Sequence, residues 1–418
     1  MNNIYHYPNK QRKLDATAAP ASTDSADTRA IVDSVQVQRF AVEFDYPVVF
    51  TRHAFDPVNL HLLDVVRRRE PGKRHRVAVF IDGGVAQALP HLAGQIQAYF
   101  SAHNEFLDLV GDIVVLKGGE DCKNDPDFIT NLLQILSDKA IDRHSYAIAI
   151  GGGAIMDAVG YAAAIFHRSV RHIRFPTTVL GQDDSGVGVK NAVNWLGLKN
   201  LVGTFAPPWA VINDGVFIDS LPAREKRCGM SEAVKVALIR DRDFFLWLES
   251  NALALARFET VPLSYLIKRS AQIHMHQIAH GGDPFESGSA RPLDYGHWVA
   301  HKLERMTNQQ VLSHGEAVAI GIALDAHYSV LAGLLPAGED MRVHQLLLTL
   351  GFKLWNDELE SRHESGRLAV LQGLREFKEH LGGELTITLL SAIGKGIEVH
   401  EINDQWVTES IAWLKHLK

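Results

Sequence analysis

The sequence predicts a chain in two parts, a parallel α/β domain followed by a mainly helical domain. Between residues 76 and 175 short apolar runs alternate with helical patterns, and this alternation is typical of a parallel sheet covered by helices on both faces. From about Ile218 onward, long helical patterns dominate. With 418 residues the chain is also too long for one small core. We therefore expect domains at 36–217 and 218–418, with a boundary near residues 214–220.

The first domain is expected to follow an N-terminal tail. Residues 1–35 are polar and lack periodicity, which predicts disorder. Apolar runs predict strands at 35–40, 76–84, 112–116, 146–150 and 172–175. Helical patterns predict helices that follow the second strand through Tyr99, then at 128–140 and 154–166. The small residues of the last helix indicate that it packs closely on the sheet.

The second domain is predicted to contain long helices. Their patterns lie at 225–249, 263–280, 296–306, 315–331 and 366–380. One late strand is predicted, at 384–390.

Composition excludes several classes of partner. The net charge of −7 provides no positive field for nucleic acid or an anionic membrane surface. Two cysteines, Cys122 and Cys228, cannot make a disulfide framework, which fits a reducing compartment. The most apolar stretch, 146–166, is interrupted by glycines and Asp157, so it is not expected to span a membrane. The N-terminus lacks the apolar core of a signal peptide, and we expect a cytoplasmic protein.

Three histidines suggest a metal site in the second domain. His297 and His301 stand four residues apart, so on a helix they share one face. His314 begins a second predicted element and could return to meet them if the chain bends between the two. A further ligand would then come from elsewhere, most naturally a carboxylate. The alternative is that a chain with 21 histidines contains such a pair by chance.

Glycine turns suggest a dinucleotide site in the first domain. A predicted strand runs directly into Gly151-Gly152-Gly153 and then into a helix, where exposed backbone N–H groups can bind a pyrophosphate. Asp82 ends another strand, where an acid can bind a ribose hydroxyl. The segment 118–123 adds a second glycine turn with Glu120 and Lys123. Each turn alone could be purely structural, but together they favour a dinucleotide site.

Two further groups of polar residues stand out. The glycine-broken segment G-Q-D-D-S-G-V-G-V-K-N-A-V-N is unlike a helix or a strand and is interpreted as a functional loop, although a solvated loop is the alternative. Its surroundings, 168–200, carry Arg168, Arg171, Asp184, Lys190, Lys199 and Asn200. Glu232 and Lys235 stand three residues apart on a predicted helix. They could form a surface ion pair, or Glu232 could face inward and be the missing carboxylate.

These segments, in this order, resemble the sugar-phosphate cyclase superfamily, whose best-known member is 3-dehydroquinate synthase. The motifs that carry the resemblance are I-G-G-G-A-I-M-D, R-F-P-T-T-V-L-G-Q-D-D-S-G-V-G-V-K, L-K-N, M-S-E-A-V-K, Y-G-H-W-V-A-H-K-L-E and L-S-H-G-E-A-V. They span roughly residues 76–400, and the ordered set is far more specific than any single motif. The resemblance implies a Rossmann-like NAD domain followed by a helical metal-binding domain.

The resemblance also implies roles for individual residues. Glu232, His297 and His314 would hold a catalytic zinc ion, for which Co²⁺ could substitute. His301 would lie near the departing phosphate and the proton transfers, and the further catalytic groups would be Asp184, Lys190, Lys235 and Glu286. The implied NAD contacts are Asp82, Glu120, Lys123, Gly152, Gly153, Asp157, Thr177, Thr178, Lys190 and Lys199. The implied substrate contacts are Arg168, Asp184, Lys199, Asn200, Lys235, Arg291 and Asp294. Arg168 would reach the substrate phosphate across a dimer interface, so a homodimer is expected.

The chemistry of this family gives these residue types a purpose. NAD⁺ removes a hydride from a ring hydroxyl that zinc polarises as a Lewis acid. The new ketone acidifies the adjacent C–H, so inorganic phosphate can be eliminated. The cofactor then returns its hydride, the ring opens, and an intramolecular aldol reaction closes a carbocycle. Lysines and Arg168 would supply local positive charge.

The sequence departs from the 3-dehydroquinate synthase pattern where the substrate would bind. Within residues 283–297, Glu286 is kept, the arginine is displaced to Arg291, and Asp294 replaces an asparagine. His276 stands where the family has a lysine, and Val189 replaces a glycine. The forms V-G-V-K, R-P-x-D-Y-G-H and H-L-G-G-E-L-T look more like the sedoheptulose 7-phosphate cyclases, typified by 2-epi-5-epi-valiolone synthase. The histidine at position 301 is nevertheless retained as in 3-dehydroquinate synthase.

The sequence therefore predicts a phosphate-eliminating carbon–oxygen lyase that depends on NAD and zinc. Sedoheptulose 7-phosphate, which would give a C7 cyclitol in secondary metabolism, is the favoured substrate. The alternative is 3-dehydroquinate synthase of the shikimate pathway, which uses a seven-carbon 3-deoxy sugar acid phosphate. More distant alternatives are a metal-dependent polyol or alcohol dehydrogenase and a non-enzymatic binding protein.

Overall fold

The computed structural model describes residues 38–196, 198–285, 293–307, 311–380 and 385–418. It divides the chain into a short unit that ends at Phe44 and a compact unit over Asp45–Lys418. The predicted tail, 1–35, lies outside the described residues. The strand predicted at 35–40 is wrong for its described part, because residues 38–40 have no regular structure and Phe40 is exposed. Among the described helices, none has the length and apolar character needed to cross a bilayer.

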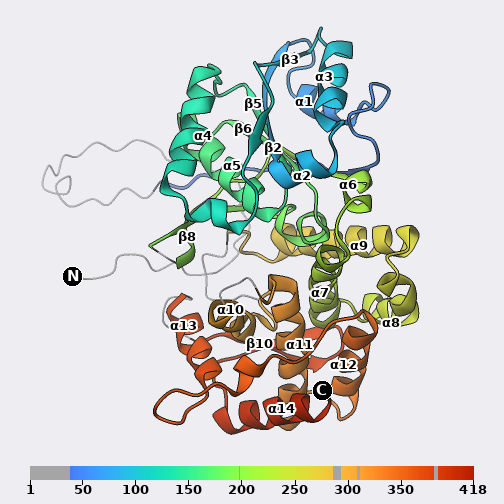
Figure 1. The fold of residues 1–418 in the computed structure, drawn as a ribbon, viewed down its shortest axis with the longest axis vertical. Coiled ribbons are helices and arrows are strands. Elements are labelled where there is room, and N and C mark those ends of the chain that lie inside the picture. The colour runs from blue at the N-terminus through green and yellow to red at the C-terminus, as the bar shows by residue number, and fades with distance from the viewer. Residues whose placement is uncertain (1–37, 197, 286–292, 308–310, 381–384) are drawn as a thin grey trace, which may run out of the picture. The chain divides into compact units, whose positions relative to one another are not determined.

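A parallel sheet forms the first half of the compact unit, as predicted (Figure 1). Its order is β1-β9-β6-β5-β2-β3, and β4 also pairs with β2. The strands are β1 (Val48–Thr51), β2 (His75–Asp82), β3 (Leu107–Leu109), β4 (Val114–Leu116), β5 (Tyr146–Gly151), β6 (Arg171–Pro176) and β9 (Ala210–Asp214). Because every pair in this sheet is parallel, the carboxyl ends of the strands meet at one edge.

Helices cover both faces of this sheet because its central strands are apolar on both sides. Val77 and Val79 of β2 pack in one core with α1 (His61–Arg67) and α3 (Leu92–Ala102). Ala78 and Phe80, which point the other way, pack in a second core with α4 (Pro126–Asp138) and α5 (Gly153–Ile165). The strands and helices predicted between 76 and 175 are therefore confirmed in kind and order.

Several elements of the sheet half were not predicted. They are β1, β3, β9, α6 (Gly215–Asp219) and the antiparallel hairpin of β7 (Lys190–Trp195) and β8 (Leu198–Phe205). The helical pattern predicted through Tyr99 is two helices, α2 (Gly83–Ala88) and α3. The polar segment interpreted as a loop begins with a π-helical turn, η3 (Gly181–Ser185), and continues into β7. Two 3₁₀ turns, η1 (Glu120–Asn124) and η2 (Phe166–Arg168), complete this half.

The second half is mainly helical, as predicted. Its helices are α7 (Ala223–Arg240), α8 (Arg242–Ala256), α9 (Thr260–His280), α10 (His297–Met306), α11 (His314–Leu331), α12 (Glu339–Thr349), α13 (Gln372–His380) and α14 (Asp404–His416), with 3₁₀ turns η4 (Asp357–Glu360) and η5 (Ala369–Leu371). The single helix predicted at 225–249 is two helices, because Asp241 breaks the pattern and caps α8 by accepting a hydrogen bond from the Phe244 N–H. The predicted late strand is a hairpin of β10 (Ile387–Ala392) and β11 (Lys395–Val399).

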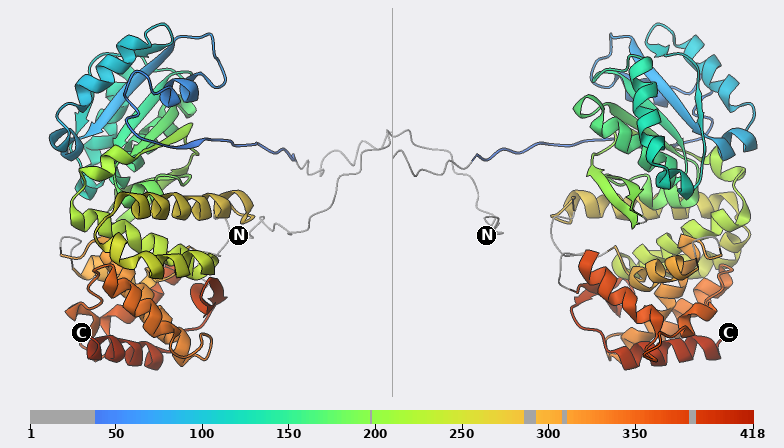
Figure 2. Two further views of the ribbon diagram at one scale, coloured as in Figure 1. Left: turned by 90° about the vertical axis from the view of Figure 1, so that its right-hand side faces the viewer. Right: turned by 60° about the vertical axis from the view of Figure 1, so that its left-hand side comes forward.

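Helices α7 and α9 lie between the sheet and the remaining helices (Figures 1 and 2). Both contact η3 on the sheet side, and α7 packs against α11 on the other side. Almost all residues of α7 from Cys228 to Ile239 are buried. A polar side chain on this helix must therefore find its partners inside the protein.

Candidate metal and cofactor site

Helix α7 places Glu232 and Lys235 in the interior. Glu232 is 0% exposed and Lys235 is 3% exposed, and the two side chains form an ion pair. Of the two alternatives that the sequence left open, the inward-facing position is the one observed. An ionised pair at this depth requires further polar partners, because burial of charge is costly.

Two histidines meet Glu232 because each begins a helix. His297 is the first residue of α10 and follows Gly296, whose φ of +77° favours glycine. A Cβ at Gly296 would also lie 2.8 Å from the backbone nitrogen of Ile322, so α10 and α11 approach closely here. His314 is the first residue of α11, whose start is fixed by a capping box between Ser313 and Glu316.

The three side chains form a set that fits a divalent metal ion. Glu232 Oε1 lies 3.7 Å from His297 Nε2 and 3.5 Å from His314 Nε2. Among the residues that the structure describes, this buried oxygen accepts no hydrogen bond. His297 Nδ1 lies 3.0 Å from the Tyr295 carbonyl oxygen, so it carries the proton and leaves an Nε2 lone pair facing Glu232. One carboxylate and two imidazoles are a donor set typical of zinc, and the three predicted ligands are thus brought together.

His301 lies beside this set. Its ring centroid is 5.5 Å from that of His297 and 6.1 Å from that of His314. His301, Glu304 and His314 form a second group whose ligand atoms are close enough to share an ion. Burial, together with His297 and His314, lowers the pKa of His301 to about 3. His301 is therefore a neutral imidazole at physiological pH.

The electrostatics of the site are set by burial and by a few charges. Burial and Lys235 lower the pKa of His297 to about 4. Burial would raise the pKa of Glu232, but Lys235 and the two histidines lower it well below its ordinary value. Burial opposes protonation of His314, but Glu304 and Glu232 raise its pKa to about 9. Without a cation, His314 takes up a proton, which a bound metal ion would displace.

Asp184 lies beside Lys235 and connects this site to the sheet half. Its Oδ1 atom is 2.7 Å from His274 Nδ1 and 3.9 Å from Lys235 Nζ. Nothing in the sequence singled out His274, because its helix, α9, contains three nearby histidines. His276, at the position where the family has a lysine, instead stacks on His280 with ring centroids 4.4 Å apart. Asp294 precedes α10 and contributes to raising the pKa of Lys235.

A buried arginine that sequence reasoning missed holds the segment between η3 and β7. Arg174 of β6 donates hydrogen bonds to the carbonyl oxygens of Gly186 (3.0 Å), Gly188 (2.7 Å) and Lys190 (3.0 Å). It also donates to Asn191 Oδ1 at 2.7 Å. The signal was a charged residue in the middle of the apolar strand R-H-I-R-F-P. Arg174 thus fixes the backbone that carries Lys190.

The predicted cofactor residues gather at the carboxyl edge of the sheet. Asp82 ends β2 and accepts hydrogen bonds from the first N–H groups of α2. A Cβ at Gly118 would lie 2.3 Å from the Asp82 carboxylate, and one at Gly151 would lie 3.1 Å from Asp82 Cβ. Gly152 is the N-cap of α5, whose N-terminus has N–H groups suited to a phosphate. A Cβ at Gly152 would lie 3.5 Å from Thr178 Cγ2, and Thr177, the preceding residue, is buried.

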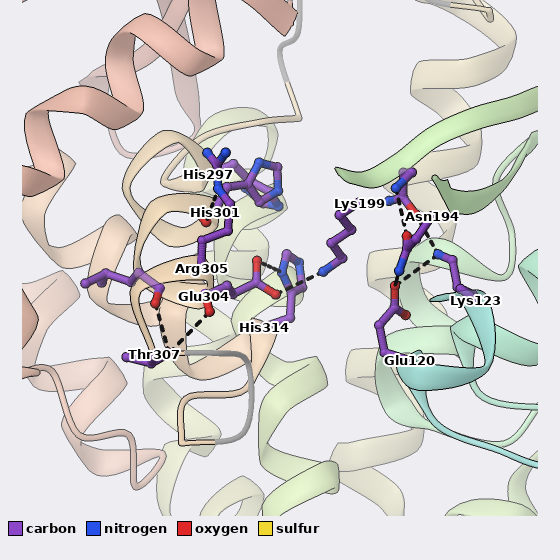
Figure 3. A network of polar contacts seen from close by, with 12 residues as sticks. Glu120, Lys123, Asn194, Lys199, His297, His301, Glu304, Arg305, Thr307 and His314 are labelled. Carbon is purple, nitrogen blue, oxygen red and sulfur yellow. Dashed lines mark hydrogen bonds and ion pairs between the residues drawn. The ribbon is translucent and has the colours of Figure 1, made fainter. Parts of the chain in front are cut away.

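Lys123 joins this edge to the hairpin of β7 and β8 (Figure 3). Its Nζ atom lies 2.9 Å from Asp157 Oδ2 and 3.3 Å from Glu120 Oε1. It also donates a hydrogen bond to Asn200 Oδ1 at 2.5 Å. Burial opposes the charge of Lys123, but Asp157 and Glu120 raise its pKa. The predicted NAD contacts Glu120, Lys123 and Asp157 are therefore one cluster.

Two predicted residues have other placements, and two lie outside the described residues. Lys199 forms an ion pair with Glu304 at 3.0 Å. Arg168 follows the C-terminus of α5, a helix of 13 residues whose N-terminus carries Gly153, so it lies about 20 Å from the glycine turn. A single chain does not bring it to the site. Glu286 and Arg291 lie outside the described residues.

Comparison with known proteins gives this site its context. Family models for the N-terminal and C-terminal parts of 3-dehydroquinate synthase match residues 113–228 and 229–369. The 3-dehydroquinate synthase of a Nitratiruptor species is 41% identical over 235 residues, which cover 56% of this chain and 65% of that protein, just under two thirds of its length. The 2-epi-5-epi-valiolone synthase of Streptomyces glaucescens is 33% identical over 360 residues, which cover 86% of this chain and 88% of that protein.

A solved structure is similar over nearly the whole chain. It is a 2-epi-5-epi-valiolone synthase from Streptomyces hygroscopicus subsp. jinggangensis 5008 with NAD⁺ and Zn²⁺ bound. The TM-score is 0.79 at 25% sequence identity, and the match covers 92% of this chain and 100% of that chain. With two matching family models and a relative aligned along most of its length, this chain belongs to the 3-dehydroquinate synthase family of sugar-phosphate cyclases.

Proposed function

We propose that the protein is an NAD- and zinc-dependent cyclase that eliminates phosphate from sedoheptulose 7-phosphate and closes a C7 cyclitol ring. The observation that carries this proposal is the buried Glu232 carboxylate, whose free oxygen faces the Nε2 atoms of His297 and His314. These three residues would hold the zinc ion, which would polarise a substrate hydroxyl. NAD, bound at the carboxyl edge of the sheet, would accept a hydride and return it.

The residues around this centre have complementary roles in the proposal. Lys235 and Asp184 lie beside Glu232 and would orient the ring hydroxyls. His301 lies beside the two histidines of the metal site, with its ring centroid 5.5 Å from that of His297, and would serve phosphate elimination. Arg174 holds the backbone of Lys190, and the charge of Lys190 would stabilise an enolate-like intermediate.

The preference for a substrate without a carboxylate is supported by charge. Asp294 lies close enough to Lys235 to influence its pKa, and an acid here would repel the carboxylate of a sugar acid. The charge of Asp294 therefore favours sedoheptulose 7-phosphate over the substrate of 3-dehydroquinate synthase.

The experiment incubates the purified protein with NAD⁺, Zn²⁺ and either sugar phosphate, and follows free phosphate and the mass of the product. We expect phosphate and a C7 cyclitol from sedoheptulose 7-phosphate, without accumulation of NADH. Turnover of the 3-deoxy sugar acid phosphate alone would make the protein a 3-dehydroquinate synthase. Net NADH from a simple polyol, with no phosphate from either sugar, would instead indicate a dehydrogenase.

A further inference from the structure

Glu304 is a buried carboxylate that connects a proposed metal ligand with the hairpin of β7 and β8. It lies on α10 and is only 4% exposed. Its Oε2 atom is 3.2 Å from His314 Nδ1, and its Oε1 atom is 3.0 Å from Lys199 Nζ. Figure 3 shows Lys199 extending from the hairpin toward Glu304 and His314. Both carboxylate oxygens of Glu304 are thus occupied by side chains.

The next residue of β8 faces the opposite way. Asn200 accepts a hydrogen bond from Lys123 in the predicted cofactor cluster, and its backbone N–H donates to Asn194 Oδ1 at 2.9 Å. Consecutive residues of one strand therefore contact the cofactor cluster on one side and the support of the metal site on the other. The strand is irregular here, because Asn200 has a φ of +54° and the register with β7 shifts between Val193 and Trp195.

The contact with Glu304 determines which nitrogen of His314 can bind a metal ion. An ionised carboxylate only accepts hydrogen bonds, so His314 must carry a proton on Nδ1. Once a bound metal ion has displaced the proton on Nε2, that atom presents a lone pair on the side of Glu232 Oε1, 3.5 Å away. Carboxylates that fix metal-binding histidines in this way raise metal affinity and orient the ring.

We propose that Glu304 is a positioning residue that orients His314 for metal binding. Lys199, on the β7–β8 hairpin, in turn orients Glu304, so the hairpin helps to hold the metal ligand in place. This inference rests on the proposed metal site. The competing arrangement makes Glu304 itself a ligand, together with His301 and His314. Glu304 is disfavoured as a ligand because both of its oxygens have hydrogen-bonding partners, whereas Glu232 Oε1 accepts no hydrogen bond from any described residue.

The test measures zinc affinity by chelator competition, and ligand geometry by the visible absorption of the Co²⁺ protein. In Glu304→Gln, Lys199 can only donate, so it takes the amide oxygen and turns the NH₂ group toward His314 Nδ1. That nitrogen must then accept, which moves the proton to Nε2, the ligating atom. We expect zinc to bind about 10–100-fold more weakly, with a tetrahedral Co²⁺ spectrum retained at saturating metal.

A second variant separates positioning from a general structural role. With Lys199→Met added to Glu304→Gln, the amide can rotate and present its oxygen to the Nδ1 proton. We expect the double variant to bind zinc more tightly than Glu304→Gln alone. If the substitutions acted only through loss of packing, their losses of zinc affinity would add, and the double variant would bind zinc more weakly than Glu304→Gln alone.

Glu376→Gln is the matched control. Glu376 lies on α13 and forms ion pairs with Lys302 (3.0 Å) and Arg305, which are on α10, the helix that carries Glu304. It does not contact the proposed ligands. The zinc affinity of the Glu376→Gln protein should equal that of the wild type. Unchanged zinc affinity in Glu304→Gln would overturn the inference, and so would loss of the tetrahedral Co²⁺ spectrum in both Glu304 variants, because Glu304 would then be a ligand. A wild-type protein that binds no zinc would overturn the metal site itself, whereas zinc binding without phosphate release would overturn only the proposed reaction.

Discussion

Two buried carboxylates near His314, those of Glu232 and Glu304, differ in their hydrogen-bonding partners. This difference distinguishes the proposed metal ligand from the proposed positioning residue. Glu232 has an oxygen without a hydrogen-bond donor among the described residues, whereas both oxygens of Glu304 are engaged. A buried acceptor without a donor costs free energy, so the position of Glu232 is best explained by a cation. Residue type alone could not separate the two, because both are glutamates on apolar helices.

Asp325 provides a prediction at this scale. This buried residue of α11 holds the start of α10 by accepting hydrogen bonds from the Gly296 N–H (3.1 Å) and from Trp298 Nε1 (3.0 Å). Burial raises its pKa to about 7 from the ordinary 3.8, although both hydrogen bonds oppose the rise. Since the folded state binds this proton more tightly than the unfolded state, Asp325 favours folding most below pH 4 and loses that contribution as the pH rises to about 7.

We therefore expect a contribution of about 4 kcal/mol to the free energy of unfolding to disappear between pH 4 and pH 7. Urea unfolding of the metal-free protein at several pH values would measure it. In Asp325→Asn the decline over this interval should be smaller, because no proton is lost there. An identical pH dependence in both proteins would mean that Asp325 titrates at its ordinary pKa.

At the scale of elements, function depends on how neighbouring segments hold one another. The segment from η3 to β7 has little regular structure, so few backbone hydrogen bonds hold it in place. Arg174 of β6 holds it instead, by donating hydrogen bonds to three carbonyl oxygens and one amide oxygen. The hairpin that follows contacts both the cofactor cluster and Glu304. These are the segments that the sequence described least well.

Replacing Arg174 by Met should destabilise this segment. Each buried acceptor that loses its donor costs about 1–3 kcal/mol, so we expect a loss of roughly 3 kcal/mol or more in the free energy of unfolding. The free energy of unfolding of Arg174→Lys should lie between those of Arg174→Met and the wild type, because one ammonium group cannot reach four separated acceptors. Chemical denaturation would measure these changes. Arg76→Met, on strand β2 of the same sheet, removes an exposed arginine and should change stability by no more than about 0.5 kcal/mol. An equal loss at both positions would refute the specific role of Arg174.

At the scale of the whole molecule, the position of Arg168 favours a dimer. The residue precedes β6 and lies at the opposite edge of the sheet from the proposed site. If it binds substrate phosphate, as the family resemblance implies, a second copy of the chain must supply it. Two-fold symmetry would then give each site one arginine from its partner.

Mixing inactive variants tests this arrangement. Arg168→Ala and Glu232→Gln subunits should each be inactive alone. In a mixed dimer, one site combines an intact Glu232 with an intact Arg168 from the other subunit. Random exchange of equal amounts should therefore restore about a quarter of the wild-type rate of phosphate release. No recovery, despite subunit exchange shown by native mass spectrometry, would contradict a contribution of Arg168 across the dimer interface.

The sequence alone determined the alternation of strands and helices between 76 and 175 and the helical character after Ile218. Both follow from local apolar periodicity. It also singled out Glu232, His297 and His314, because their motifs match a family in order. Short strands such as β1 and β9 escaped prediction, since their pairing partners are distant in sequence.

Only the tertiary structure decided which way the polar side chains face. Glu232 and Lys235 stand on one helix with a spacing that also suits a surface ion pair, and burial of α7 from both sides turned them inward. Glu304, His274 and Arg174 gain their roles from partners 10, 90 and 12–17 residues away in sequence. Periodicity records which residues share a face of an element, but packing between elements determines what that face meets.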